Sequence, residues 1–374
     1  MFLVSEDWYF WSHRLPLARA AIRRGWQVYV VCRISDLQDQ MEREGFHVIP
    51  LQSFERSTQA PLIEIRSFIE IWSIYRRMRP DLVHHVALKL VIYGSLASIL
   101  IRVRCTVNAL AGLGFLFTSD NRMLRFVRNM VLVLLRFLCN RTCTRIIVQN
   151  NEDLELLLSY DIAPQNHLLL ISGSGVDIET FALSVEPAGK PIVMLASRML
   201  WDKGIAEFVE AARQINLLSS VARFVLVGIP DPSNPASISQ ETITTWVDQG
   251  TVEWWGHSSD MPATIALSSI VCLPSYREGL PKVLIEAAAI GRALIATDIA
   301  GCRPIVHHGR NGLLVPPKDI LKLAEAIKEL LDKPILRREM GLYGRQLVVE
   351  RFSDQKIAFE TFALYDELLN ECCQ

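Results

Sequence analysis

The stretch Ser275-Tyr-Arg-Glu-Gly-Leu-Pro-Lys-Val-Leu-Ile-Glu-Ala-Ala-Ala289 joins a polar loop to the start of an apolar helical pattern. The apolar run at 270–274 precedes it and predicts a buried strand. Pro281 suits the first position of a helix, where a missing N–H costs nothing. The first turn of that helix leaves free backbone N–H groups around residues 280–283, and the helix dipole adds to their attraction for an anion.

Two glutamates flank this predicted helix tip. Glu286 lies five residues beyond Pro281, which corresponds to about 7–8 Å along a helix axis. That distance suits the separation between a diphosphate at the tip and the ribose of a nucleotide, while Glu278 lies at the sugar end. Gly279 lets a ligand approach the backbone closely. The spacing alone also fits a strand–turn–helix with two solvated glutamates. Features elsewhere in the chain are needed to choose between a nucleotide-sugar site and this simpler interpretation.

Strand and helix patterns alternate along most of the chain, which predicts an α/β fold with parallel sheets covered by helices. A loop rich in aromatic residues is expected over 5–12, and a helix over 13–24. The polar stretch 184–190 divides two such series, so we predict one domain at 1–183 and another at 184–353. A closing helix at about 354–374 is expected to cross back onto the first domain. The predicted strands before the boundary are 1–4, 27–32, 47–51, 81–84, 145–149 and 167–171.

Composition narrows the class of protein. The 374 residues suit two domains of ordinary size, and the formal net charge of −1 gives no bulk attraction for nucleic acid. The 8 cysteines show no paired spacing, which predicts reduced thiols in a cytosolic setting and no zinc site. The first residues do not resemble a signal peptide, and no uncharged apolar run is long enough to span a bilayer.

Residues 122–145 form a distinct segment that is apolar and basic and contains no acid. Arg122, Arg125, Arg128 and Arg136 interrupt its apolar residues, so a helix spanning a bilayer is not expected. Two interpretations remain open. The helix either lies on an anionic membrane surface, or it is a core helix whose arginines extend to solvent.

Cations and histidines follow several predicted strands. Arg198 and Lys203 follow the strand at 191–197, and two cations at a strand end can clamp a diphosphate and stabilise its charge as it leaves. The chain contains no Asp-x-Asp motif, so these cations are expected to replace a metal ion. In the first domain, His13, Arg14, His84 and His85 follow or end strands, where ligands bind such sheets.

Several motifs occur together in the order known from one enzyme family. They are Gly173-Ser-Gly-Val-Asp177, Ser197-Arg-Met-Leu-Trp-Asp-Lys-Gly204, Val225-Leu-Val-Gly228, Glu253-Trp-Trp-Gly-His257, Pro274 to Glu286, and Gly312-Leu-Leu-Val-Pro-Pro317. With them the chain resembles the retaining glycosyltransferases of family 4, whose GT-B fold has two Rossmann-like domains facing each other across a cleft. The first half also resembles the branch that builds bacterial surface polysaccharides on undecaprenyl carriers, through the motifs Ser12-His-Arg-Leu-Pro-Leu-Ala18, Arg79-Pro-Asp-Leu-Val-His84, Tyr93-Gly-Ser95 and Ala111-Gly-Leu-Gly114.

The resemblance implies a role for each matching residue. Arg198 and Lys203 match the pair that binds the diphosphate, Glu278 the residue at the donor sugar, and Glu286 the residue at the ribose. Gly279 and Leu280 match backbone contacts to phosphate and sugar, and His84 or His85 lies where a histidine approaches the transferred sugar. His13 and Arg14 are expected on the acceptor side. The family's glycine-rich loop after the first strand is absent from 5–11.

We therefore expect a retaining, metal-independent hexosyltransferase without a cofactor. It would move a sugar from a nucleotide diphosphate, UDP by expectation, to a lipid-linked glycan at the cytoplasmic face of the membrane. One alternative is a nucleotide-sugar 2-epimerase of the same fold, which would need acid and base carboxylates in the site. Another is a non-catalytic GT-B partner subunit, against which the complete set of Arg198, Lys203, Glu278 and Glu286 argues.

Overall fold

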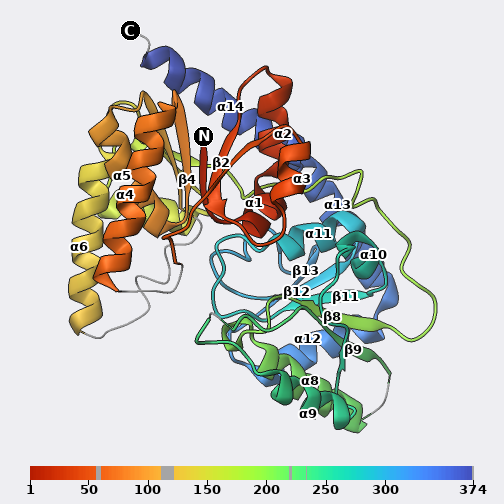
Figure 1. Cartoon of the computed structure of the whole chain (residues 1–374). Helices are drawn as coiled ribbons and strands as arrows, with labels where there is room; N and C mark the ends of the chain where they lie inside the picture. Colours follow the sequence, from red (N-terminus) through yellow and green to blue (C-terminus); the bar gives the residue numbers. More distant parts are fainter. Residues whose placement is uncertain (56–59, 111–121, 219–220, 233, 373–374) are drawn as a thin grey trace. The chain divides into compact units, whose positions relative to one another are not determined.

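The computed structural model of the protein describes residues 1–55, 60–110, 122–218, 221–232 and 234–372. Within these ranges the chain forms two compact units, Met1–Ser174 with Asp354–Gln374, and Gly175–Ser353. Each unit contains a parallel sheet with helices on its faces, which confirms the predicted α/β class (Figure 1). The first unit ends at Ser174, whereas the sequence places the boundary after residue 183.

The first sheet has seven strands, and every neighbouring pair is parallel. Its order is β3-β2-β1-β4-β5-β6-β7, so the chain moves outward from β1 in one direction and then returns to continue in the other. Its strands are β1 (Phe2–Glu6), β2 (Tyr29–Arg33), β3 (His47–Pro50), β4 (Leu82–Val86), β5 (Cys105–Leu110), β6 (Thr144–Val148) and β7 (Leu168–Leu170).

Helices cover both faces of this sheet, and alternate residues of a strand face different helices. Phe2 and Val4 pack with residues of the C-terminal helix, whereas Leu3 packs with residues of the fourth and fifth helices. α4 lies against α5, and α5 against α6, so these three form one layer (Figure 1). The helices of this unit are α1 (Asp7–His13), α2 (Leu15–Arg23), α3 (Gln38–Arg43), α4 (Pro61–Met78), α5 (Leu88–Ile101), α6 (Arg122–Cys139), α7 (Asn151–Ser159) and α14 (Asp354–Glu371).

Two parts of the first unit differ from the sequence prediction. The expected aromatic loop over 5–12 is wrong, because Asp7–His13 is helical and buries Phe10. The strand β5 and the helix α5 were not predicted. α5 carries a single charged residue, Lys89, and has no polar side that would reveal a helical period.

The second sheet has the order β10-β9-β8-β11-β12-β13, again with parallel pairs. This order places β8 directly beside β11, so the loops that leave these two strands are neighbours. The strands are β8 (Ile192–Ala196), β9 (Arg223–Val227), β10 (Glu253–Trp254), β11 (Ile270–Leu273), β12 (Ala293–Thr297) and β13 (Gly312–Val315); the helices are α8 (Ile205–Leu218), α9 (Gln240–Asp248), α10 (Met261–Ala266), α11 (Lys282–Ile290), α12 (Ile320–Asp332) and α13 (Pro334–Arg351).

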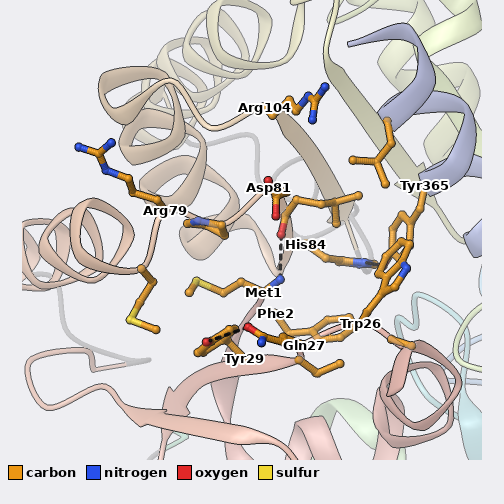
Figure 2. Close-up of a pocket in the computed structure, with 16 residues that line it drawn as sticks. Met1, Phe2, Trp26, Gln27, Tyr29, Arg79, Asp81, His84, Arg104 and Tyr365 are labelled. Carbon is orange, nitrogen blue, oxygen red and sulfur yellow. Dashed lines mark hydrogen bonds between the residues drawn. The ribbon is translucent and has the colours of Figure 1, made fainter. Parts of the chain in front are cut away.

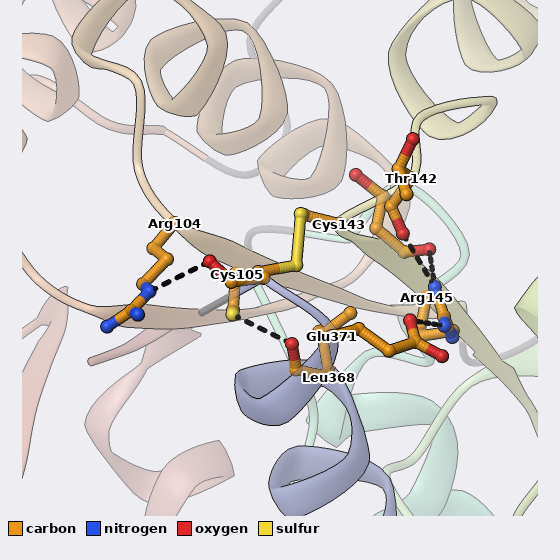
Figure 3. The surroundings of a disulfide bond; sticks show 9 residues. Arg104, Cys105, Thr142, Cys143, Arg145, Leu368 and Glu371 are labelled. Atoms are coloured by element: carbon orange, nitrogen blue, oxygen red, sulfur yellow. Dashed lines mark hydrogen bonds and ion pairs between the residues drawn. A yellow bond between two sulfur atoms is a disulfide. The ribbon is translucent and has the colours of Figure 1, made fainter. Parts of the chain in front are cut away.

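The C-terminal helix α14 belongs to the first unit, as the sequence predicts. It packs against α2, and Glu371 near its end forms an ion pair with the buried Arg145 of β6. A disulfide between Cys143 and Cys372 joins the end of this helix to the segment before β6 (Figure 3). The chain end is therefore held to the sheet by apolar, ionic and covalent contacts.

This disulfide corrects the prediction that the thiols are reduced, which is wrong for Cys143 and Cys372. The two residues are separated by 229 positions in the sequence, so no local spacing could reveal the pair. Their Cα atoms lie 6.1 Å apart because the fold brings α14 back to β6. The free cysteines of the described chain are all buried, at positions 32, 105, 139, 272 and 302.

We predict that Cys372→Ser lowers the free energy of unfolding of the first unit by about 2–4 kcal/mol, because the cross-link closes a long loop. Chemical denaturation with and without a reductant measures this. The reductant should destabilise the wild type and leave the variant unchanged. Equal stability of the oxidised and reduced wild type would contradict a structural role for the bond.

Candidate functional site

The loops that leave β8 and β11 are packed backbone to backbone. The β8 loop passes through a short 3-10 turn, Trp201–Lys203, and reaches Gly204, which has a φ of 71°. A Cβ at Gly204 would lie closer than 3.0 Å to the carbonyl of Pro274 in the β11 loop. The Tyr276 N–H also donates to the Asp202 carbonyl, at 2.8 Å. These contacts fix the two loops relative to each other.

This packing brings Lys203 and Glu278 together. The Lys203 Nζ donates to Glu278 Oε1 at 2.6 Å, and their side chains are only 17% and 13% exposed. The Oγ of the fully buried Ser275 donates to the same carboxylate oxygen at 2.7 Å. Glu278 is therefore held by one cation and one hydroxyl, and both partners come from the loops packed at Gly204.

The end of β12 and the loop that follows it contact the main chain around Glu278. The hydroxyl of Thr297, the last residue of β12, donates to the Ser275 carbonyl. A Cβ on Gly301 would lie closer than 3.0 Å to the carbonyl oxygens of Glu278 and Gly279. The main chain at Glu278 and Gly279 can rest on this loop only because residue 301 has no side chain.

The helix α11 begins at Lys282, so Pro281 is its N-cap residue and not its first helical residue as predicted. Glu286 lies one turn further along and is buried, with Oε1 at 3.0 Å from the Lys282 ammonium. Gly279 and Leu280 are half-buried in the loop before the helix. Glu278, the helix start and Glu286 thus follow one another along a single segment.

Arg198 does not join this group in the structure. Its guanidinium donates to Asp231 Oδ2 at 2.7 Å, and its side chain remains 42% exposed. Asp231 follows β9, the strand on the other side of β8. The structure therefore brings Lys203 to Glu278, while the other predicted diphosphate cation is paired with a carboxylate that sequence reasoning missed.

The predicted acceptor-side residues lie at the junction of α1 and α2. The His13 Nδ1 lies 2.6 Å from the Ser12 hydroxyl, and its ring stacks on Tyr9 at 4.3 Å. Arg14 is the N-cap residue of α2, and its side chain is 5% exposed. Whether either residue touches an acceptor stays a prediction.

His84 and His85 are both buried inside the first unit, on opposite faces of β4. His84 bonds to the Tyr365 hydroxyl of α14, and burial together with the nearby Arg14 holds its pKa well below the usual range. His85 contacts Asn108 at 2.7 Å and Tyr75 at 2.9 Å, and burial lowers its pKa to about 4. Both rings are uncharged near neutral pH, and contact of either ring with a sugar stays a prediction.

A cavity of about 460 Å³ opens in the first unit, at the amino ends of β1, β2 and β4. Figure 2 shows Trp26, His84 and Tyr365 along one side of it, with Arg104 and Asp81 also contributing. Ligands of parallel sheets bind at the opposite, carboxyl edge. This cavity therefore lies at the other edge of the sheet, although His84, a predicted site residue, also lines it.

Two family models match the chain, one in its first half and one in its second half. A model of the 4-like glycosyl transferases matches residues 1–150, and a model of the group 1 glycosyl transferases matches residues 190–333. The chain belongs to the family 4 glycosyltransferases. The loops around Lys203 and Glu278 lie within the second match.

Relatives over most of the chain include two bacterial glycosyltransferases that are named for diphospho-undecaprenol acceptors. N,N'-diacetylbacillosaminyl-diphospho-undecaprenol alpha-1,3-N-acetylgalactosaminyltransferase of Campylobacter jejuni is 26% identical and covers 95% of each chain. UDP-Gal:alpha-D-GlcNAc-diphosphoundecaprenol alpha-1,3-galactosyltransferase of Escherichia coli is 24% identical and covers 82% of this chain and 80% of its own length.

Solved structures confirm the GT-B fold of this glycosyltransferase. Sucrose-phosphate synthase from Thermosynechococcus elongatus has a TM-score of 0.80 at 21% identity and covers 99% of this chain and 98% of its own. HepE from Anabaena, solved with UDP, has a TM-score of 0.77 at 16% identity and covers 98% of this chain and 99% of its own. At these identities the likeness concerns the fold alone.

Two further properties of the described chain bear on the enzyme's chemistry and location. No three His, Cys, Asp or Glu residues in that part of the chain form a group suited to a metal ion. None of the helices within the described ranges has both the length and the apolar composition needed to cross a bilayer. Metal independence of the transfer and attachment to a membrane surface both stay predictions.

Sequence reasoning missed Ser275, Asp231 and Gly301 as neighbours of the candidate site residues. Ser275 opens the diagnostic stretch, and its place at the end of a buried strand was a usable signal. Asp231 lies in a proline-rich loop without any pattern. Gly301 acts through the side chain it lacks, which only the packing of the loops reveals.

We predict that Gly301→Ala lowers the transfer rate by about 10–100-fold, since small misplacements of a site can cost this much. The new methyl group would displace the main chain at Glu278 and Gly279. Affinity for free UDP should also fall, because the displaced main chain of Gly279 is the part expected to contact the phosphate. Gly344→Ala is the matched control, since its Cβ would meet Ala288 at 3.3 Å, away from the loop. A fully active Gly301→Ala enzyme would contradict the supporting role.

Proposed function

We propose that this glycosyltransferase transfers a sugar, with retention of its anomeric configuration, from a UDP-sugar to an undecaprenyl-diphosphate-linked glycan. The observation that carries the proposal is the contact between Lys203 and Glu278 at the tip of α11. Two relatives along most of the chain are named for diphospho-undecaprenol acceptors, and one of them for a UDP-sugar donor. These names support the acceptor and donor classes.

The ion pairs of the site match the groups that a donor would engage. A diphosphate entering at the tip of α11 would replace Glu278 as the partner of Lys203, and Asp231 as the partner of Arg198. Glu278 would then be available for hydroxyls of the sugar. In the same way, the Glu286 carboxylate would leave the Lys282 ammonium and accept hydrogen bonds from the ribose hydroxyls. The main chain of Gly279 and Leu280 would contact phosphate and sugar.

The proposed reaction is a same-face displacement. The acceptor hydroxyl attacks the anomeric carbon on the face from which UDP departs, and the bond from that carbon to the phosphate oxygen breaks. The leaving phosphate oxygen takes the proton of the attacking hydroxyl. Lys203, Arg198 and the N–H groups at the start of α11 stabilise the charge that develops on the diphosphate, so no metal ion is required.

The lipid-linked acceptor requires the enzyme to work at a membrane, which we propose is the cytoplasmic face. The support lies in α6, where Arg125 and Arg136 are exposed and Arg128 is half-buried; the side chain of Arg122 lies outside the described residues. The opposite side of α6 packs on the first sheet through Leu132, Leu135 and Leu138. The packed side of α6 fits the core-helix interpretation, and its basic side supports the membrane-surface interpretation.

We predict that Lys203→Ala lowers kcat by about 100-fold or more, the scale of losing one group that stabilises transition-state charge. Glu286→Ala should instead weaken binding of free UDP by about 1.5–3 kcal/mol. Transfer of radiolabelled sugar from UDP- and GDP-sugars to membrane acceptors, release of free nucleotide, and UDP titration measure both. Lys322→Ala is the control, since that lysine is exposed on α12 and pairs with Glu325.

Three outcomes would count against this mechanism. Near-normal turnover of Lys203→Ala would remove the cation from the reaction. Equal UDP affinity of Glu286→Ala and wild type would remove Glu286 from the ribose. Loss of wild-type activity in EDTA, with recovery in Mg²⁺, would contradict a metal-independent transfer.

A second prediction concerns the arginines of α6. Each cation near an anionic leaflet contributes about 1 kcal/mol, screened by salt. Changing all four to Gln should therefore release the enzyme from anionic vesicles and lower activity on a lipid-linked acceptor, while activity on a water-soluble acceptor analogue changes little. The variant carries Arg122→Gln, Arg125→Gln, Arg128→Gln and Arg136→Gln, and the control carries Gln at the exposed arginines 213, 310, 338 and 351.

Vesicle co-sedimentation at low and high salt measures the binding. If the wild type ignores anionic vesicles at low salt, or if the four-arginine variant stays bound, electrostatic attachment through α6 is wrong. If the variant and the control lose the same amount of vesicle binding, the binding depends on net charge and not on α6.

A further inference from the structure

The outer surface of the layer formed by α4, α5 and α6 is unusually apolar. On α6, Phe126, Met130, Val133 and Phe137 are between 60% and 70% exposed. Their spacing of three or four residues places them in one stripe along the helix. These large side chains do not pack on the sheet, because the opposite side of α6 makes the core contacts.

A second stripe of the same kind lies on α4, a helix that no sequence feature singled out. Leu62, Ile65 and Ile69 are 73%, 55% and 51% exposed, and their spacing places them on one side of the helix. Between the two stripes runs α5, whose only charged residue is Lys89 and which exposes Leu100. The three helices are neighbours in the order α4-α5-α6 (Figure 1).

The charges around these stripes are mainly basic, although Arg136 pairs with Asp161, an exposed residue that follows α7. Arg66 is exposed on α4 among the apolar residues, and Arg125 and Arg136 are exposed on α6. The acidic residues of α4 are occupied elsewhere: Glu64 pairs with Lys89, and Glu70 accepts the N–H groups of residues 52 and 53. An apolar surface with a basic border is typical of helices that lie in the plane of an anionic membrane.

We propose that the outer surface of α4, α5 and α6 is a single membrane-docking face, with the α4 stripe as a second insertion point beside α6. The occupant is an anionic lipid bilayer, because a second copy of the chain would set arginines against arginines. This inference rests on the proposed lipid-linked acceptor and deepens it. It assigns membrane insertion to Leu62, Ile65 and Ile69, whereas the proposed function uses only the charges of α6.

The position of the α4 stripe gives the docked enzyme an orientation. α4 runs from the carboxyl edge of β3 to the amino edge of β4, and its exposed apolar residues lie in its first half. Insertion of this half brings the carboxyl edge of the first sheet towards the bilayer. A lipid-linked glycan would then reach that edge without leaving the membrane.

The test uses the full chain carrying Leu62→Ser, Ile65→Ser and Ile69→Ser, with every arginine retained. The control carries Leu321→Ser, Ile335→Ser and Leu342→Ser, which are 65%, 72% and 58% exposed on α12 and α13. Binding to vesicles of phosphatidylcholine and phosphatidylglycerol is measured at high salt, where the electrostatic contribution is screened. The α4 variant should bind at least about tenfold more weakly than the wild type, and the control should match the wild type.

A fluorescent label reports insertion directly. An environment-sensitive dye on Ile65→Cys should shift to shorter wavelength on these vesicles, while the same dye on Leu321→Cys should not. A Cys373→Ser background removes a thiol outside the described residues. Unchanged binding of the α4 variant, or no shift at position 65, would overturn the docking face. A third result would also overturn it: the wild type forms a dimer and does not bind vesicles, while the α4 variant is a monomer. The face would then be covered by a second copy of the chain.

Activity separates this inference from the proposed function. With a water-soluble acceptor analogue and no vesicles, the α4 variant should turn over at the wild-type rate. If the wild type forms no product with any acceptor, the proposed transfer fails, while the vesicle and label results still decide the docking face.

Discussion

The ion pair between Lys203 and Glu278 is the interaction on which the second unit's site depends. Two charges that are largely removed from water are costly unless they face each other and are hydrogen-bonded. The parallel neighbours β8 and β11 supply the proximity, and Ser275 supplies the additional hydrogen bond. Glycines at 204 and 301 allow three loops to approach closely enough to hold the pair. A diphosphate that pairs with Lys203 would replace the Glu278 carboxylate as its anionic partner. The cation would therefore already be in position before the donor binds.

The first unit shows a different use of buried polar groups. Asp7, fully buried at the start of α1, accepts hydrogen bonds from Ser35 and from the N–H groups of Asp36 and Leu37. Burial acts to raise the pKa of Asp7, but these hydrogen bonds outweigh it and the pKa is lowered. The charged carboxylate thereby ties the loops after β1 and β2 together at the carboxyl edge of the sheet. His84 and His85, in the middle of β4, connect this strand to the helices on its two faces through Tyr365 and Tyr75.

Much of this architecture follows from the sequence because local patterns determine it. The strands at 144–148 and 270–273 have clear apolar runs and clear ends, and both were predicted within a residue. The features that were missed depend on contacts between distant segments. No local sequence pattern distinguishes Asp231 or Gly301. Cys143 and Cys372 come close only because α14 packs back onto the first sheet. The position of Arg198 shows the same limit, because its strand-end location was clear but its partnership with Asp231 was not. The membrane-facing interpretation of α6 depended on charges, whereas the exposed apolar stripes became visible only once the packing of the helices was known.

The central claim is that the Lys203–Glu278 pair is the donor-free form of the diphosphate site. A crystal structure of the enzyme with a non-hydrolysable UDP-sugar analogue tests it most directly. In that complex, Lys203 Nζ should have left Glu278 and lie about 3 Å from a diphosphate oxygen, with the Glu278 carboxylate facing the sugar. If the Lys203–Glu278 pair is intact and the diphosphate is bound elsewhere, the pair is not the donor-free form of the diphosphate site.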